Sequence, residues 1–121
     1  MIQWPALLLL VAVAQAPAGR KVEIVSVTGC LREQGANQWM LVAATDPVAS
    51  VANQAQGDEI PKVAPAGKNA FRLIGVSEFN FPQHRDRTMV IRGLFIKDKV
   101  SRINVTSAVE AVASCVAGAP K

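Results

Sequence analysis

Few residues of this chain are of the types that do chemistry, and they do not form a catalytic pattern. Nucleophilic catalysis needs a serine, threonine or cysteine beside a base. The only histidine, His84, lies in the charged stretch Gln83–Arg87, which is typical of a solvated or hydrogen-bonded surface histidine. Asp58 and Glu59 are adjacent in a loop, as in a solvated acidic turn. The sequence also lacks a glycine-rich phosphate loop, so we expect no enzymatic activity, no catalytic residues and no cofactor.

The first residues are typical of an export signal. Ala6–Ala14 is the apolar run ALLLLVAVA, which suits a signal peptide and is too short for a membrane span of about 20 residues. Overlapping A-x-A patterns follow, so we expect a signal peptide over residues 1–16, cleaved between residues 14 and 18. The segment before the run has no lysine or arginine, and a buried N-terminal helix is the alternative. Export predicts a periplasmic or secreted protein with no transmembrane span after cleavage.

The two cysteines, Cys30 and Cys115, lie near the two ends of the remaining domain. In an oxidising compartment, two cysteines most simply form one disulfide. That bridge would close a loop of about 86 residues, which the chain-entropy model values at roughly 4.6 kcal/mol. Two free buried thiols are the alternative. Two cysteines and one histidine do not complete the four ligands of a structural zinc site, so we expect no metal.

Lysine and arginine side chains are the remaining candidates for a functional site. The chain has 13 Lys+Arg against 9 Asp+Glu, a net charge of +4. Mild basicity suits an anionic glycan or lipid headgroups, but it also suits an ordinary solvated surface. Nucleic acid is disfavoured, because an exported chain meets little of it and few aromatic side chains look available for base stacking. The candidate anion-binding residues are Arg72, Arg85, Arg87, Arg92, Lys97, Lys99 and Arg102.

Short strands separated by turn residues must position these side chains. Alternating or continuous apolar residues bounded by turn signals predict a mainly β chain. Gly93 is expected to mark a kink or a close approach. The predicted strands cover Lys21–Arg32, Gln38–Thr45, Ala70–Val76, Thr88–Ile96 and Val100–Thr106, with a tight hairpin at Lys97–Lys99.

Two segments are ambiguous. Asp46-Pro47 has the chemistry of a helix start and Gly57 that of a helix stop, which is compatible with a short helix in the connection between the second and third strands. The remainder, Gly57–Lys68, is expected to be loop. In Ser107–Val116, Ser107 and Glu110 have capping-box spacing, which argues for a helix. The apolar alternation of the preceding strand continues there, and we favour a strand.

Several short motifs, taken in order, resemble a known group. They are Val27-Thr28-Gly29-Cys30-Leu31, Phe71-Arg72-Leu73-Ile74-Gly75, His84 ahead of Met89-Val90-Ile91-Arg92-Gly93, Ile103-Asn104-Val105-Thr106-Ser107, and Ala113-Ser114-Cys115. This order is similar to that of uncharacterised exported bacterial proteins of small OB-like fold with paired terminal cysteines. The chain departs from their H-x-G-H motif, because Asp86 and Arg87 stand at the Gly and His positions. The resemblance implies a five-stranded OB-like Greek-key barrel and the terminal disulfide, and it carries no known activity.

These observations predict one domain over residues 20–116 and a disordered tail over residues 117–121, and we expect a monomer. The expected function is that of an exported, non-enzymatic binding or envelope-associated module. Two alternatives remain open at this point: a binder of anionic glycan or lipid headgroups through a basic face, and a structural subunit of an envelope complex.

Overall fold

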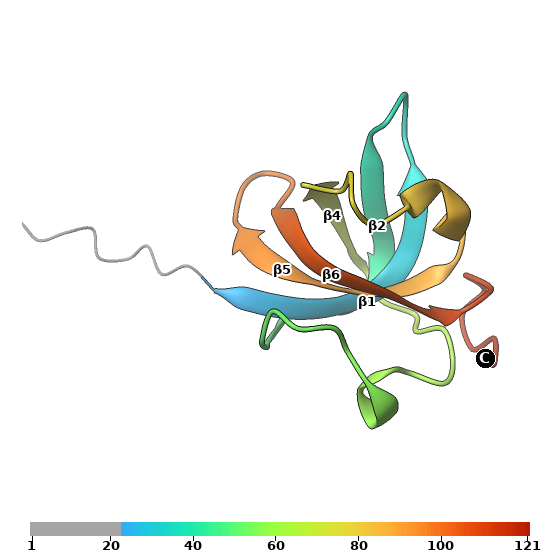
Figure 1. Cartoon of the computed structure of the whole chain (residues 1–121). Helices are drawn as coiled ribbons and strands as arrows, with labels where there is room; N and C mark the ends of the chain where they lie inside the picture. Colours follow the sequence, from blue (N-terminus) through green and yellow to red (C-terminus); the bar gives the residue numbers. More distant parts are fainter. Residues whose placement is uncertain (1–22) are drawn as a thin grey trace, which may run out of the picture.

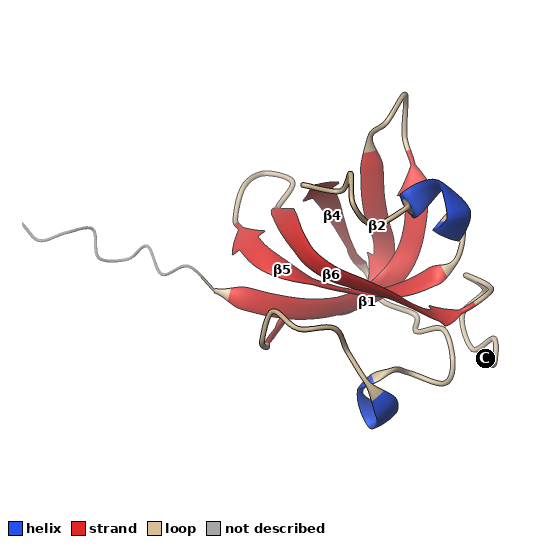
Figure 2. Cartoon of the chain, in the orientation of Figure 1, coloured by secondary structure: helices blue, strands red, loops and turns tan. Residues whose placement is uncertain are grey.

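The computed structural model describes residues 23–121, and the predicted signal peptide lies outside the described residues. Strands and their turns make up most of the fold, as Figures 1 and 2 show. The prediction of a mainly β chain is confirmed. The elements are β1 (Ile24–Glu33), β2 (Trp39–Ala44), β3 (Val48–Ala49), η1 (Gly57–Glu59), β4 (Asn69–Ile74), η2 (Phe81–His84), β5 (Thr88–Ile96) and β6 (Arg102–Val112), where η is a 3-10 helix.

The six strands form one mixed sheet whose hydrogen bonds close into a ring. The strand order is β2-β4-β6-β5-β1-β3, and β2 also pairs with β1. Neighbours are antiparallel except β4 and β6, which are parallel. The ten-residue strand β1 makes closure possible, because its first half pairs with β3 and its second half with β2, while β5 pairs along its other side. The ring brings together strands that are far apart in the sequence.

Two glycines allow close backbone approach within this ring. A Cβ on Gly29 would lie 2.8 Å from the Cβ of Ala44, at the place where β2 leaves β1. A Cβ on Gly93 would overlap the carbonyl oxygen of Asn104, and the β5–β6 register shifts between Arg92 and Gly93. The expected close approach at Gly93 is therefore present, since only a residue without a side chain fits there.

The core lies inside the ring and is closed at one end by η2. Phe81 of η2 is 1% exposed and packs edge-on against Trp39, with the ring centroids 5.6 Å apart. Burial of one such aromatic side chain stabilises the fold by about 1.5–3 kcal/mol. The main cluster consists of Val25, Val27, Leu31, Trp39, Leu41, Ala44, Phe71, Leu73, Phe81, Met89, Ile91, Ile103 and Val105.

The predicted disulfide is present and ties β1 to the segment after β6. The Cα atoms of Cys30 and Cys115 are 5.5 Å apart. The favoured strand in Ser107–Val116 is also found, as far as Val112, because β5 pairs with it along its length. Ser107 and Glu110 make no capping box: the Ser107 hydroxyl donates to the carbonyl of Asn53, and Glu110 accepts hydrogen bonds from other side chains.

The structure differs from the sequence-based expectation in the connection between β2 and β4. Val48 and Ala49, expected in a short helix, pair instead with Ser26 and Val25 of β1. This pairing satisfies backbone groups that the first half of β1 would otherwise leave open. The one helical turn of the connection, η1, begins at Gly57, where the helix was expected to end.

The structure also differs at the C-terminus, where a disordered tail over residues 117–121 was expected. The N–H of Gly118 donates to the carbonyl of Ala64 at 2.8 Å, and the N–H of Ala64 donates to the carbonyl of Ala119 at 2.9 Å. Val63 and Pro120 form an isolated bridge. The disulfide at Cys115 already holds the start of the tail near the 62–64 segment. Only a few further residues must then be fixed for the tail to pair there, so the entropic cost of the pairing is small.

Candidate anion-binding surface

Two arginines lie side by side on the outer face of the sheet. Arg72 of β4 and Arg102 of β6 are register partners in the parallel pair. In β4 the neighbours Phe71 and Leu73 are buried, and in β6 Ile103 is buried. Because side chains alternate between the two faces of a strand, both arginines point outward. Two like charges that are direct neighbours on adjacent strands repel each other, and a bound anion would relieve this repulsion.

The loop between β5 and β6 adds two lysines to this pair. Lys97 and Lys99 are exposed, and the N–H of Arg72 donates to the carbonyl of Ser101 at 2.9 Å, which places the loop beside β4. Figure 1 shows this loop at the upper left, above the ends of β5 and β6. We define the basic face as Arg72, Lys97, Lys99 and Arg102. Among residues 23–121, Arg72 and both lysines make no salt bridge.

Arg102 is only weakly paired. Its Nη2 lies 3.9 Å from Oδ2 of Asp98, the single acidic residue in the loop. Its Nε is buried and donates to no other described residue. Buried polar groups are normally hydrogen-bonded, so the Arg102 side chain lacks a partner that such a group usually has. Arg102 thus adds a largely uncompensated positive charge to the basic face.

Arg92 is a candidate anion-binding residue that the structure places elsewhere. It is 5% exposed and lies under the connection between β2 and β4. Its guanidinium donates to the carbonyl of Asn53 at 3.0 Å and lies 3.3 Å from Oε2 of Glu59. A hydrogen bond from the Gln56 backbone, followed by the interaction with Arg92, lowers the pKa of Glu59. Arg92 therefore fastens the connection to the sheet and is not accessible to a ligand.

Arg85 and Arg87 lie near η2 and are paired with carboxylates. Arg85 Nη2 is 2.7 Å from Oε1 of Glu33, and its guanidinium lies 5.8 Å from the Trp39 ring centroid. Arg87 pairs with Glu110 at 3.1 Å. These two arginines hold the segment after η2 against β1 and β6. The seven candidate cations therefore form three groups, of which only the basic face leaves most of its charge uncompensated.

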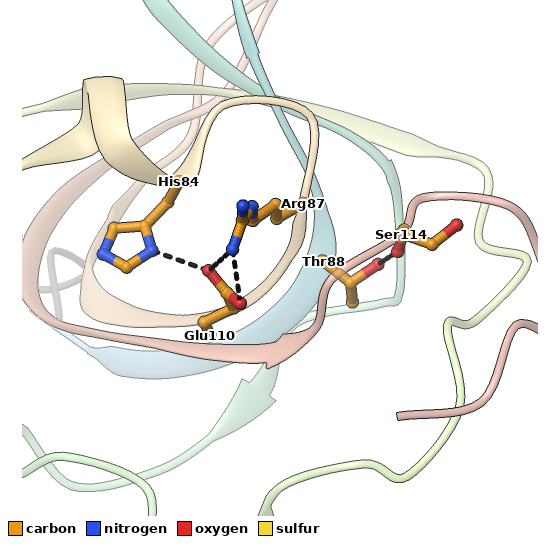
Figure 3. Close-up of polar contacts among 5 residues, drawn as sticks. All are labelled: His84, Arg87, Thr88, Glu110 and Ser114. Carbon is orange, nitrogen blue, oxygen red and sulfur yellow. Dashed lines mark hydrogen bonds and ion pairs between the residues drawn. The ribbon is translucent and has the colours of Figure 1, made fainter.

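His84 belongs to the group around Glu110. Figure 3 shows His84 and Arg87 both pointing at the Glu110 carboxylate, with His84 Nδ1 2.8 Å from Oε1. Burial, the largest single influence, raises the pKa of Glu110, but the hydrogen bonds from His84 and Arg87 outweigh it, and the net pKa is lowered. The nearby Thr88 hydroxyl donates to the carbonyl of Ser114 at 2.7 Å. The sequence predicted a surface histidine that is either solvated or hydrogen-bonded, and His84 is hydrogen-bonded.

Within the described part of the chain, His, Cys, Asp and Glu side chains do not gather in threes in a way that would hold a metal ion. Residues 23–121 also contain no helix of the length and apolarity needed to cross a membrane. Comparison of the chain with protein-family models, curated proteins and solved structures found no match.

Sequence reasoning named all four members of the basic face but not their grouping. The pairing of Arg72 with Arg102 depends on two parallel strands separated by β5 in the sequence, and no local pattern signals it. The burial of Arg92 was missed for the same reason. Its only sequence signal was its position beside Gly93, inside an apolar strand.

Proposed function

We propose that this protein is an exported, non-enzymatic module of OB-like barrel fold that binds an anionic glycan through the basic face. The observation that carries the proposal is the adjacency of Arg72 and Arg102 beside a loop with two unpaired lysines. An anionic polymer presents repeated negative groups, and several neighbouring cations on two strands and the adjoining loop suit such a ligand better than a single small anion.

The strand order supports the OB-like assignment. The ring β1-β2-β4-β6-β5 has the connectivity of a five-stranded Greek-key barrel when β1, β2, β4, β5 and β6 are counted as strands one to five. OB-folds bind oligosaccharides and oligonucleotides on the face of strands two and three and the loops between strands one and two and between strands four and five. Arg72 lies on the third of these strands, and both lysines lie in the last of these loops.

The disulfide supports export, because disulfides persist in oxidising compartments. The apolar segment Ala6–Ala14 supports a cleaved signal peptide. N-terminal sequencing of protein recovered from the host envelope is expected to begin between residues 15 and 19, and a start at Met1 or Ile2 would contradict the export proposal.

A glycan is favoured over a membrane surface by the surroundings of the basic face. Peripheral membrane binding combines cations with apolar side chains that enter the lipid. Of the large exposed apolar residues in the described chain, only Val100 lies in the loop of the basic face, and the others belong to the connection between β2 and β4 or to the C-terminal tail. One valine offers little apolar area for insertion.

The proposal is tested by titrating the protein with a soluble polyuronate oligosaccharide. Arg72→Ala/Arg102→Ala is expected to weaken binding about tenfold at low ionic strength, because each exposed charge pair is worth up to about 1 kcal/mol. Binding should also weaken between low and physiological ionic strength, where charges are screened over about 8 Å. The matched control is Lys62→Ala/Lys121→Ala, which removes the same net charge at the C-terminal tail, on the side of the molecule away from the β5–β6 loop.

Equal losses in the two double variants would show binding to net charge alone and would contradict a specific basic face. Anionic phospholipid vesicles form the second arm. Binding to vesicles but not to polyuronate, with the same dependence on Arg72 and Arg102, would contradict the glycan proposal and assign the face to a membrane.

A further inference from the structure

A groove of about 610 Å³ lies beyond the end of the basic face. It opens between the turn that joins β1 to β2 and the segment that follows β4. Trp39 and Phe81 form its floor, and both are nearly fully buried, so the floor is rigid. The groove belongs to none of the three groups of cations described above.

The polar lining of the groove is uncharged and unpaired. The side chains of Asn37, Ser77 and Asn80 are exposed, and none of them hydrogen-bonds to another described residue. Each offers both a donor and an acceptor. The lining contains no acidic or basic side chain. This set of neutral donors and acceptors suits a ligand with several uncharged hydroxyl groups, which is the chemistry of a sugar ring.

The backbone on both sides of the groove is held by local contacts and by two residues in an uncommon conformation. Asn37 and Asn80 have φ values of 58° and 57°, in the left-handed region, which costs energy for a residue other than glycine. The N–H of Asn37 donates to Oε2 of Glu33, whose other oxygen accepts from Arg85. These contacts brace the backbone of the turn that carries the Asn37 side chain.

The groove lies close to the basic face along β4. Gly75 lines the groove and directly follows Ile74, whose register partner on β6 is Asn104. A Cβ on Gly75 would overlap Oδ1 of the Asn104 side chain, so this side chain of β6 lies against Gly75. Arg72 is three residues from Gly75, or about 10 Å along the strand. One extended ligand can therefore reach both places.

We infer that the groove is a neutral saccharide subsite for the same anionic glycan that the basic face binds. The inference rests on the proposed function and adds what the charges alone do not supply, which is discrimination between a glycan and any other polyanion. The basic face attracts the negative groups, and the amide and hydroxyl groups of the groove recognise the hydroxyls of an adjoining sugar.

The test uses the full disulfide-bonded protein and two probes of similar charge, a polyuronate oligosaccharide and a poly-glutamate peptide. Asn37→Gly/Asn80→Gly removes both amides, and glycine tolerates the left-handed backbone. This variant is expected to bind polyuronate about tenfold more weakly and poly-glutamate unchanged. Ser77→Ala, at an exposed position, is a second variant with a smaller expected loss in the same direction.

Arg72→Ala/Arg102→Ala separates the two proposals, since it should weaken binding of both probes. If the groove variants leave polyuronate binding unchanged, or weaken both probes equally, the saccharide subsite is overturned while the basic face stands. If the arginine variant leaves both probes unchanged, the proposed function itself is overturned.

Discussion

Arginines on this one sheet have two different roles: some are exposed and available to a ligand, and Arg92 is buried and structural. Arg72 and Arg102 are on the outside with few partners, whereas Arg92 is buried and contacts Asn53 and Glu59. Guanidinium groups are suited to this second role, because their donors are arranged in a planar fork that contacts several acceptors at once.

Arg92→Ala is expected to lower the free energy of unfolding by about 2–3 kcal/mol, because it removes the charged hydrogen bond to the carbonyl of Asn53 and the contact that fastens η1. Arg72→Ala is the matched control and should change stability by less than about 0.5 kcal/mol. Urea denaturation measures both, and equal midpoints for the two variants would contradict the structural role of Arg92.

The Glu110 carboxylate is a second case at this scale. Its pKa is lowered in the folded protein from the ordinary value of 4.5, so the unfolded chain takes up its proton at higher pH. The stability that it contributes is therefore present above about pH 4.5 and is lost as the pH falls through the lower, folded-state pKa.

Glu110→Gln is expected to reduce the loss of stability on acidification below pH 4.5, measured as the shift of the urea midpoint with pH. Glu78→Gln is the control, because Glu78 makes no salt bridge among residues 23–121. An unchanged pH profile in Glu110→Gln would argue against the contacts with His84 and Arg87.

At the scale of elements, the β5–β6 pair depends on one residue. Gly93 lies where the register shifts, and a side chain there would overlap the backbone carbonyl of Asn104 and also crowd the Ile103 side chain. The same pair carries the loop with Lys97 and Lys99, so its geometry also positions the basic face.

Gly93→Ala is expected to destabilise the fold by roughly 3 kcal/mol, because the β5–β6 backbone must shift to admit a methyl group. Gly35→Ala is the control: its Cβ would lie in open space, and only its φ of 77° opposes the change, at about 1–2 kcal/mol. A smaller effect at Gly93 than at Gly35, measured by chemical denaturation, would refute this account.

At the scale of the whole molecule, the disulfide joins the start of the ring to the tail that lies beside the 62–64 segment. The bridge closes most of the described chain into one loop. In a domain of this size, the core supplies only a few kcal/mol of net stability, and a bridge of this span is comparable with that margin.

Cys30→Ala/Cys115→Ala is expected to lower the free energy of unfolding by about 2–5 kcal/mol. Replacing both cysteines avoids a free thiol, and the unmodified protein measured under reducing conditions is the control, which should lose a similar amount. Stability unaffected by either change would mean that the ring and the core hold the fold without the bridge.

The amino-acid sequence by itself determined the local features of this protein. The alternation of Phe71 and Leu73 with Arg72, the turn at Lys97–Lys99 and the bounds of Thr88–Ile96 follow from side-chain period and turn chemistry, which act over a few residues. The two cysteines also predicted their own bridge, since they had only each other as partners.

Only the tertiary structure decided which of these features meet. The parallel β4–β6 pair, the use of Val48–Ala49 as a strand and the pairing of the tail with residues 62–64 are contacts between segments distant in sequence. They form because closure of the ring leaves backbone N–H and C=O groups that need hydrogen-bond partners, and these segments supply them. No local sequence pattern encodes which segments will do so. For this reason the seven candidate cations could not be told apart from the sequence. In the closed ring Arg92 is buried, Arg85 and Arg87 are paired with carboxylates, and the other four lie together.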